Sequence, residues 1–167
     1  MRYNKIRKMD IANGPGVRVS IFMQGCCFNC KNCFNPETHD FAGGKEFTEE
    51  TIGHILAIAD KEYIKGLSIL GGEPMHPKNI EGSGKLAKAF KERFPDKTVW
   101  VWTGFLFDRD LKDKPKLEYI DVLVDGQYVE EKRNPLLKFR GSSNQRIIDV
   151  QKSLKENKVI EFADDEV

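Results

Sequence analysis

The chain has 167 residues, of which 40% are hydrophobic and 32% are charged, and its formal net charge is +1. This length predicts a single domain, and no apolar run approaches the length that a bilayer-spanning helix needs. The near-neutral charge gives no electrostatic reason to expect nucleic acid or a membrane as the main partner.

The first predicted element is a turn that leads into a strand. Residues 10–16 end in Gly14, Pro15 and Gly16, which together favour a tight turn. Residues 17–23 alternate in character and are rich in β-branched side chains, so they are predicted to form a strand. The segment that follows therefore starts at the carboxyl end of a strand, where ligands collect in α/β proteins.

That segment contains all four cysteines of the chain, within residues 26–33. Three of them, Cys26, Cys30 and Cys33, have the spacing C-x3-C-x2-C, which lets three thiolates converge from one loop on a soft metal. Closed zinc and ferredoxin-type sites use four protein ligands. Three thiolates would leave one position open to a ligand that is not protein, which favours a chemical role.

Two structural alternatives would use the same cysteines. Disulfides are disfavoured because the neighbours Cys26 and Cys27 pair poorly and the N-terminus carries no apolar signal segment. A zinc knuckle with Cys27 or His39 as the fourth ligand stays open, although Cys27 is better interpreted as a small buried hydrophobe. Unpaired cysteines without a signal segment predict a reducing, cytoplasmic location.

A helix is predicted from an N-cap at Thr48 to Tyr63, because the apolar positions in this stretch form one stripe. A short strand over residues 67–70 follows it. The order strand, helix, strand predicts that the two strands are parallel neighbours in one sheet.

The sequence Gly71-Gly72-Glu73-Pro74 comes directly after this strand. Two glycines at a strand end let backbone approach a ligand closely, and their amide and carbonyl groups can bind an amino acid-like group. A simple turn explains the same residues. The position favours binding, since this edge of the sheet also carries the cysteines.

Two further strands are predicted over residues 98–102 and 120–124, with a helix before the first. They end in Thr103-Gly104 and in Asp125-Gly126. This order predicts the α/β class, and specifically a partial (βα) barrel of parallel strands with its functional residues at one rim. An open parallel sheet gives the same pattern and stays a possibility at this point.

The last distinctive stretch runs from Arg140 to Gln145 and reads RGSSNQ. Its many donors suit an anion or a backbone edge, and a polar turn before a fifth strand is equally compatible. Residues 1–150 are predicted to form the domain. Residues 151–167 match no pattern and are predicted to be a solvated C-terminal extension.

The cysteine loop resembles that of the radical S-adenosylmethionine enzymes. Six segments together resemble the activating proteins of anaerobic (class III) ribonucleotide reductase, in order and over about residues 1–150. The segments are Asn13-Gly-Pro-Gly16, the cysteine loop, Gly71-Gly-Glu-Pro74, Trp100-Val-Trp-Thr-Gly104, Val124-Asp-Gly126 and Arg140-Gly-Ser-Ser-Asn-Gln145.

The resemblance implies a compact radical S-adenosylmethionine core in which Cys26, Cys30 and Cys33 hold a [4Fe-4S] cluster. The positions that it implies for S-adenosylmethionine binding are Asn35, Gly71, Gly72, Glu73, Thr103 and Asp125. No catalytic residue is implied beyond the cluster and this cofactor site.

The resemblance also implies a function. Reductive cleavage of S-adenosylmethionine would give a 5′-deoxyadenosyl radical, which would generate a glycyl radical on the large subunit of anaerobic ribonucleoside-triphosphate reductase. A low-potential donor such as flavodoxin would supply the electron. Two features depart from the family pattern: Glu73 stands where aspartate is expected, and Gln127 stands where lysine is expected.

Two rival functions use the same residues. One is an activating enzyme for another glycyl-radical enzyme, or a short radical S-adenosylmethionine protein that acts on a small molecule. The segment from Arg140 to Gln145 argues against both. The other is a non-catalytic zinc or electron-transfer module, which leaves Gly71 to Pro74 unexplained.

Overall fold

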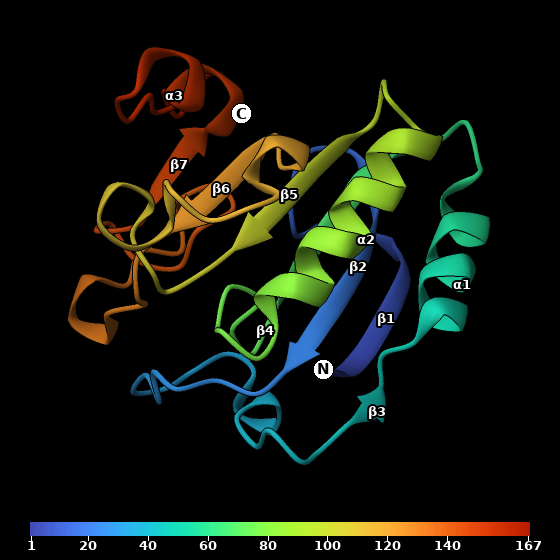
Figure 1. Ribbon diagram of the computed structural model, residues 1–167. Coiled ribbons are helices and arrows are strands. Elements are labelled where there is room, and N and C mark those ends of the chain that lie inside the picture. The colour runs from blue at the N-terminus through green and yellow to red at the C-terminus, as the bar shows by residue number, and fades with distance from the viewer.

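The computed structural model describes residues 1–167 and contains one seven-stranded sheet (Figure 1). The strands are β1 (Arg2–Asp10), β2 (Val17–Gln24), β3 (Lys45–Glu46), β4 (Ile64–Gly71), β5 (Thr98–Trp102), β6 (Val122–Asp125) and β7 (Arg146–Asp149). The α-helices are α1 (Glu49–Ala59), α2 (Ile80–Arg93) and α3 (Val150–Glu156). Short helical turns are η1 (Pro36–Thr38), η2 (Phe107–Leu111), η3 (Leu117–Tyr119) and η4 (Glu130–Lys132).

The strand order is β3-β1-β2-β4-β5-β6-β7, and the four strands from β2 to β6 in this order are mutually parallel. At both sides of this centre the pairing is antiparallel, between β1 and β2, between β1 and β3, and between β6 and β7. The prediction of an α/β fold is confirmed. The prediction of a barrel is not confirmed, because the sheet is open. The prediction of parallel strands holds for the four central strands and is wrong for the strands on either side of them.

Connection length explains only one of the two antiparallel edges, the pair β1 and β2. A short turn joins β1 to β2, and such a connection can only return the chain antiparallel to itself. The connection from β6 to β7, residues 126–145, is about as long as the connection from β5 to β6, residues 103–121, which joins parallel strands, so its length does not set its direction. Strand β1 has a largely polar sequence and no fully buried residue before Asp10, which is why its pattern did not predict a strand.

The first helix begins as predicted and ends earlier than predicted. Thr48 is its N-cap, with a capping box formed with Thr51. The helix stops at Ala59, and Tyr63 lies outside it with 51% of its surface exposed. Strand β4 therefore starts at Ile64, three residues before the predicted start.

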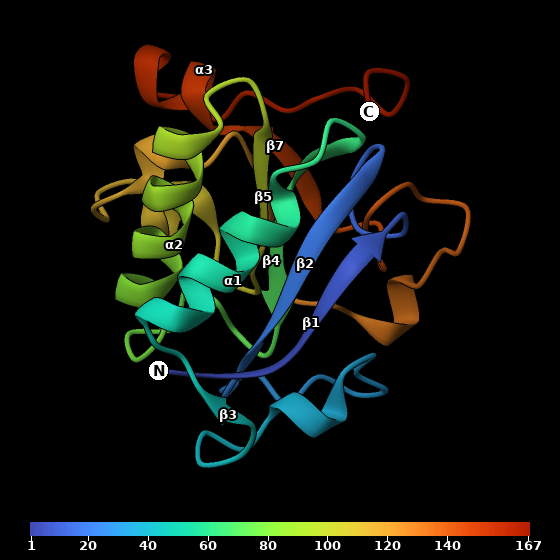
Figure 2. The ribbon, with the colours of Figure 1, turned by 90° about the vertical axis from the view of Figure 1, so that its right-hand side faces the viewer.

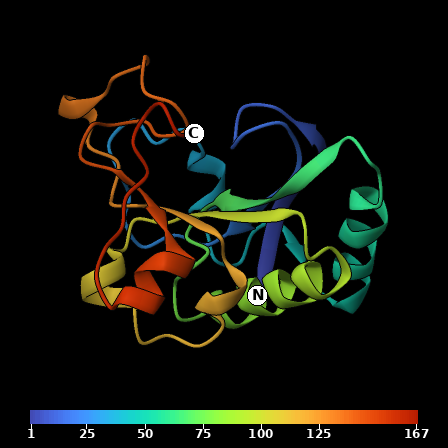
Figure 3. The ribbon, with the colours of Figure 1, turned by 90° about the horizontal axis from the view of Figure 1, so that it is seen from above.

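Helices α1 and α2 cover one face of the sheet (Figure 2). The main core lies beneath them and includes Ile21, Ile55, Leu67, Phe90 and Val101, none of which is exposed. A smaller apolar cluster lies on the opposite face and consists of Trp100, Val122, Val124 and Ile147. The last residues of the chain, beyond α3, and the long connection after β6 lie on that side (Figure 3).

Residues after 150 are mostly exposed, yet the segment is anchored to the sheet. Helix α3 buries Val150 and Ser153. Beyond it, Asp149 N–H donates to Ile160 O at 2.8 Å and Phe162 N–H donates to Ile147 O at 2.8 Å, so the tail pairs with β7. Phe162 and Val167 then pack on the smaller apolar cluster. The tail is part of the folded unit because it covers this apolar surface.

All four parallel strands end at the same edge of the sheet (Figure 1). The segment with the cysteines leaves from the arrowhead of β2, and the sequences predicted to bind a cofactor leave from β4, β5 and β6. None of the helices combines the length and apolar character needed to cross a membrane.

Candidate metal centre

The cysteine loop, residues 25–35, lies beyond the carboxyl end of β2. Cys26, Cys30 and Cys33 are half-buried, and all four cysteines are unpaired. Cys27 is exposed, so its interpretation as a buried hydrophobe is wrong. The three half-buried thiols share one short loop without converging on a single point, and His39 does not join them in a metal-binding group.

One backbone amide donates directly to a sulfur of the loop, from Asn35 N–H to Cys33 Sγ at 3.4 Å. The amides of Phe28 and Asn29 favour the thiolate form of Cys26. Burial raises the pKa of Cys26 to about 11, and the two amides oppose this rise because they favour a thiolate. Half-buried sulfurs that accept amide hydrogen bonds match the donor set of an iron–sulfur cluster. The residues present therefore fit such a cluster.

The Gly-Gly-Glu-Pro segment at the end of β4 packs directly against the start of the cysteine loop. Glu73 N–H donates to Gly25 O at 2.8 Å, and Gly72 N–H donates to Thr38 Oγ1 at 2.7 Å. A Cβ atom on Gly72 would lie 2.7 Å from Gly25 O and from Met23 O, which no side chain tolerates. Glycine at position 72 is therefore required by close approach to the backbone of β2 and its loop.

The carboxylate of Glu73 joins the ends of β4 and β5. It is 1% exposed and accepts hydrogen bonds from Thr103 Oγ1 at 2.6 Å, Gly104 N–H at 2.7 Å and Met75 N–H at 2.9 Å. Burial raises its pKa to about 7, against the effect of these three bonds. Glu73 and Thr103, both predicted to face a cofactor, thus bind each other.

Asp125, predicted to face the cofactor from β6, is fully buried. Its Oδ2 accepts from Phe107 N–H at 2.8 Å, and both of its oxygens accept from Arg146, at 2.9 Å and 2.6 Å. Arg146 also donates to Asp108 at 2.6 Å, and these two carboxylates raise its pKa, Asp125 the more. In this structure Asp125 joins β6 to β7 and leaves no oxygen without a partner.

Two phenylalanine side chains pack the cysteine loop against the neighbouring strand ends. The ring of Phe28 lies 4.9 Å from that of Phe105, and a Cβ atom on Gly104 would lie 2.5 Å from the Phe28 ring. The ring of Phe34 lies 5.1 Å from that of Tyr128. The loop that holds the thiols is therefore positioned by residues that follow β5 and β6.

The segment from Arg140 to Gln145 binds backbone. Gln145 Oε1 accepts from the amides of Gly141 and Ser142, and its Nε2 donates to Gly126 O at 3.0 Å. Ser142 Oγ accepts from Val129 N–H at 3.1 Å. Of the two predicted roles, the structure places this segment as a support for residues 126–129, which adjoin the cysteine loop. Gln127 itself donates to Phe28 O at 3.5 Å.

Two residues of the site were not predicted. Asn79 is 1% exposed, and its Nδ2 donates to Gln24 O at 3.1 Å and Glu73 O at 3.0 Å. Thr38 is fully buried, and its hydroxyl donates to Asn35 O at 2.7 Å while it accepts from Gly72. Thr38 ends the short turn η1 and Asn79 is the N-cap of α2, positions at which sequence periodicity gives no signal.

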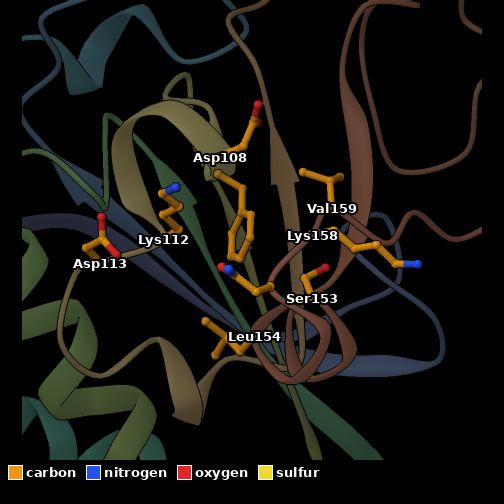
Figure 4. Close-up of a pocket in the computed structure, with 9 residues that line it drawn as sticks. Asp108, Lys112, Asp113, Ser153, Leu154, Lys158 and Val159 are labelled. Atoms are coloured by element: carbon orange, nitrogen blue, oxygen red, sulfur yellow. The ribbon is translucent and has the colours of Figure 1, made fainter.

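A cavity of about 200 Å³ lies away from this site, between η2 and α3 (Figure 4). Its lining includes Asp108, Lys112, Asp113, Ser153 and Lys158. None of the predicted cofactor-binding residues lines it. Its lining carries both acidic and basic side chains and no cysteine, so the cavity is separate from the site described above.

Comparison with known proteins gives one consistent result. The family described as a 4Fe-4S single cluster domain matches residues 12–148. A protein of Enterobacteria phage T4 is 42% identical over 148 residues, which cover 88% of this chain and 93% of the relative. A Vibrio cholerae protein is 41% identical over 150 residues, covering 88% and 97%. An Escherichia coli K12 protein is 37% identical over 148 residues, covering 87% and 96%. All three are named anaerobic ribonucleoside-triphosphate reductase-activating protein.

Proposed function

Because this chain belongs to the family of anaerobic ribonucleoside-triphosphate reductase-activating proteins, we propose that it generates a glycyl radical on the large subunit of that reductase. Its reaction is that of a radical S-adenosylmethionine enzyme. Bound together, a [4Fe-4S] cluster and S-adenosylmethionine supply an electron and a 5′-deoxyadenosyl radical that can remove hydrogen from a glycine. The chain's own residues position these groups and exclude water.

Cys26, Cys30 and Cys33 are the proposed ligands of the cluster. Gly71 and Gly72 are proposed to present backbone carbonyl groups to the amino acid end of S-adenosylmethionine. Asn35, which the Thr38 hydroxyl joins to Gly72, is proposed to bind the same cofactor. This assignment is supported by the direct bond between the Gly-Gly-Glu-Pro segment and Gly25, one residue before the first ligand. It requires no movement of the β4 end, which already lies beside the loop.

Glu73, Thr103 and Asp125 belong to the same proposed site, with a role that follows from their burial. Their side chains are bonded to protein groups, so we propose that they fix the strand ends beneath the cofactor. Preorganisation of this kind matters because a rigid rim holds a substrate in a reactive orientation. The four central strands would then form a small radical S-adenosylmethionine core within residues 1–150, and the C-terminal segment would cover one face of it.

The proposed partners follow from the same chemistry. The reductase is the protein substrate, and a low-potential donor such as flavodoxin is the proposed source of the electron. Four unpaired cysteines fit a cytoplasmic location, where thiols stay reduced. The observation that carries the proposal is the packing of the three-cysteine loop against Gly71 to Glu73 at one sheet edge.

The test is anaerobic reconstitution with iron and sulfide, followed by reduction and electron paramagnetic resonance with and without S-adenosylmethionine. We expect a [4Fe-4S] signal that changes when S-adenosylmethionine is added, and formation of 5′-deoxyadenosine. With the reductase present, a glycyl radical signal should appear. Stoichiometric zinc and no such signals would overturn the proposal.

The neighbouring cysteines give a matched control. Cys30→Ser should lose the cluster, because it removes a proposed ligand. Cys27→Ser changes the same functional group on the same loop, and its exposed side chain lies outside the proposed ligand set. It should keep both the cluster signal and 5′-deoxyadenosine formation.

A further inference from the structure

Two asparagines of the cysteine loop have an unusual backbone conformation. Asn29 has φ of 48° and Asn32 has φ of 55°, and each directly precedes a proposed ligand, Cys30 or Cys33. Only three other non-glycine residues of the chain have positive φ: Lys116, Phe139 and Asn157. Side chains with a Cβ atom avoid this left-handed region, and asparagine tolerates it best after glycine.

The conformation at Asn32 closes a turn between two proposed ligands. Cys33 N–H donates to Cys30 O at 3.2 Å, which makes residues 30–33 a four-residue turn with Asn32 as its third residue. A type II turn requires positive φ at that position. The relative direction of the Cys30 and Cys33 side chains therefore depends on a residue that accepts the left-handed region.

Asn29 lies between the first two proposed ligands, three residues after Cys26 and one before Cys30. Its positive φ therefore sets the direction of the chain between these two thiols. No backbone N–H from Cys27 to Asn32 donates to a backbone oxygen, so neither a strand nor a helix fixes this part of the loop. Local conformational preference has to do so, and the two asparagines are where that preference is strongest.

We propose that Asn29 and Asn32 are positioning residues, whose left-handed backbone directs the three thiols of the loop toward one cluster. The proposal rests on the function given above, since it concerns the ligands assigned there. Glycine at either position should preserve the function because glycine enters this region without strain. A β-branched residue should abolish it, since it excludes this conformation most strongly.

The experiment compares Asn29→Gly, Asn32→Gly, Asn29→Val and Asn32→Val with the unmodified chain after anaerobic reconstitution. Iron and sulfide per chain, the visible absorption of the cluster and the rate of iron loss to a ferrous chelator are measured. The glycine variants should match the unmodified chain within about twofold. The valine variants should bind less iron and lose it about tenfold faster, as expected from the strain of a left-handed side chain.

Asn157 supplies a matched control. It has φ of 50° and lies at the C-terminal end of α3, away from the cysteine loop. Asn157→Val introduces the same strain, so it should lower thermal stability and leave the cluster spectrum and iron loss unchanged. Circular dichroism of every variant before reconstitution separates loss of the fold from loss of the cluster.

Two outcomes would overturn the proposal. One is that the valine variants retain iron as well as the glycine variants do. The other is that Asn157→Val loses iron as fast as Asn32→Val. Failure of the unmodified chain to assemble a cluster is a different result, because it contradicts the proposed function itself.

Discussion

Two buried charged side chains join neighbouring strands at opposite ends of the sheet, Arg18 joining three strands and Glu73 two. At the amino ends of β2, β4 and β5 the guanidinium of Arg18 is fully buried and donates to Ser68 Oγ, Leu67 O and Thr98 O, at 2.8, 2.9 and 2.8 Å. At the carboxyl ends the carboxylate of Glu73 accepts from Thr103 and Gly104.

The two ends differ in what lies above the buried charge. Burial lowers the pKa of Arg18 to about 10, so it stays charged at neutral pH, and its donors are taken by neutral oxygens. Glu73 lies beneath the cysteine loop, and burial raises its pKa to about 7. The contacts of Arg18 are structural, and they lie at the amino ends of the strands, which we call the closed end. The contacts of Glu73 at the carboxyl ends are coupled to the cysteine loop. Four predictions test this difference.

The largest effect is expected at the closed end. Arg18→Met should lower the free energy of unfolding by about 3–5 kcal/mol, because it leaves several buried oxygens without donors. Denaturant unfolding of the iron-free chain measures this loss. The folded fraction should still take up iron, since Arg18 lies at the far end of the strands. A loss below about 1 kcal/mol would show that the closed end does not depend on Arg18.

The second prediction concerns pH and Glu73. A carboxyl group with a higher pKa in the folded chain than its usual value of 4.5 binds its proton more tightly when folded. Its stabilising contribution is complete below about pH 4.5 and is lost as pH rises through about 7, by up to about 3 kcal/mol. Glu73→Gln cannot titrate, so its stability should change less over this interval. Denaturant unfolding at a series of pH values measures this change. An equal pH dependence of the free energy of unfolding in the two proteins would contradict the prediction.

The third prediction concerns the contact between Gly104 and Phe28. Gly104→Ala should cost about 1–3 kcal/mol, because the new methyl group displaces the Phe28 ring. It should also reduce cluster retention, since Phe28 belongs to the cysteine loop. Gly53→Ala is the control, because a Cβ atom there meets nothing within 4 Å. This helical position should gain up to about 1 kcal/mol, with no effect on iron.

The smallest effect is expected for Thr103→Val, which keeps the shape of the side chain and removes its hydroxyl. The loss of the bond to Glu73 should cost about 1–2 kcal/mol in thermal or denaturant unfolding. It should also raise the pKa of Glu73 further and move the pH profile upward, because that bond favours the carboxylate. An unchanged pH profile of stability would mean that the Thr103 hydroxyl does not stabilise the carboxylate of Glu73.

Much of this architecture could be predicted from the chain itself. The parallel strands β2, β4 and β5 are apolar and β-branched, and they were found because packing on two faces leaves a strong pattern. The half-exposed strand β1 was missed because its burial does not alternate. The contacts of the tail with the smaller apolar cluster could not be predicted, because Phe162 and Val167 are isolated apolar residues whose partners lie elsewhere in the sequence.

The same distinction between local patterns and long-range contacts applies to the site. The cysteine spacing and the glycine pair are local, so the sequence could indicate both. The partners of Glu73 and Asp125 could not be predicted, because Thr103 and Arg146 follow them by long and unrelated intervals. For the same reason an acid that was expected to face a cofactor is found in a salt bridge with Arg146.

The packing of Phe28 on Gly104 and Phe105 has a consequence for biogenesis. During synthesis the cysteines leave the ribosome early, whereas their supporting surface is made only after α1, β4, α2 and β5. Until then the nascent loop has nothing to pack against, and its thiols are open to any thiophilic ion in the cell. The loop should therefore bind the iron–sulfur cluster selectively only after most of the polypeptide has left the ribosome. Pulse-labelled truncated chains that end before β5 should bind zinc and iron indiscriminately.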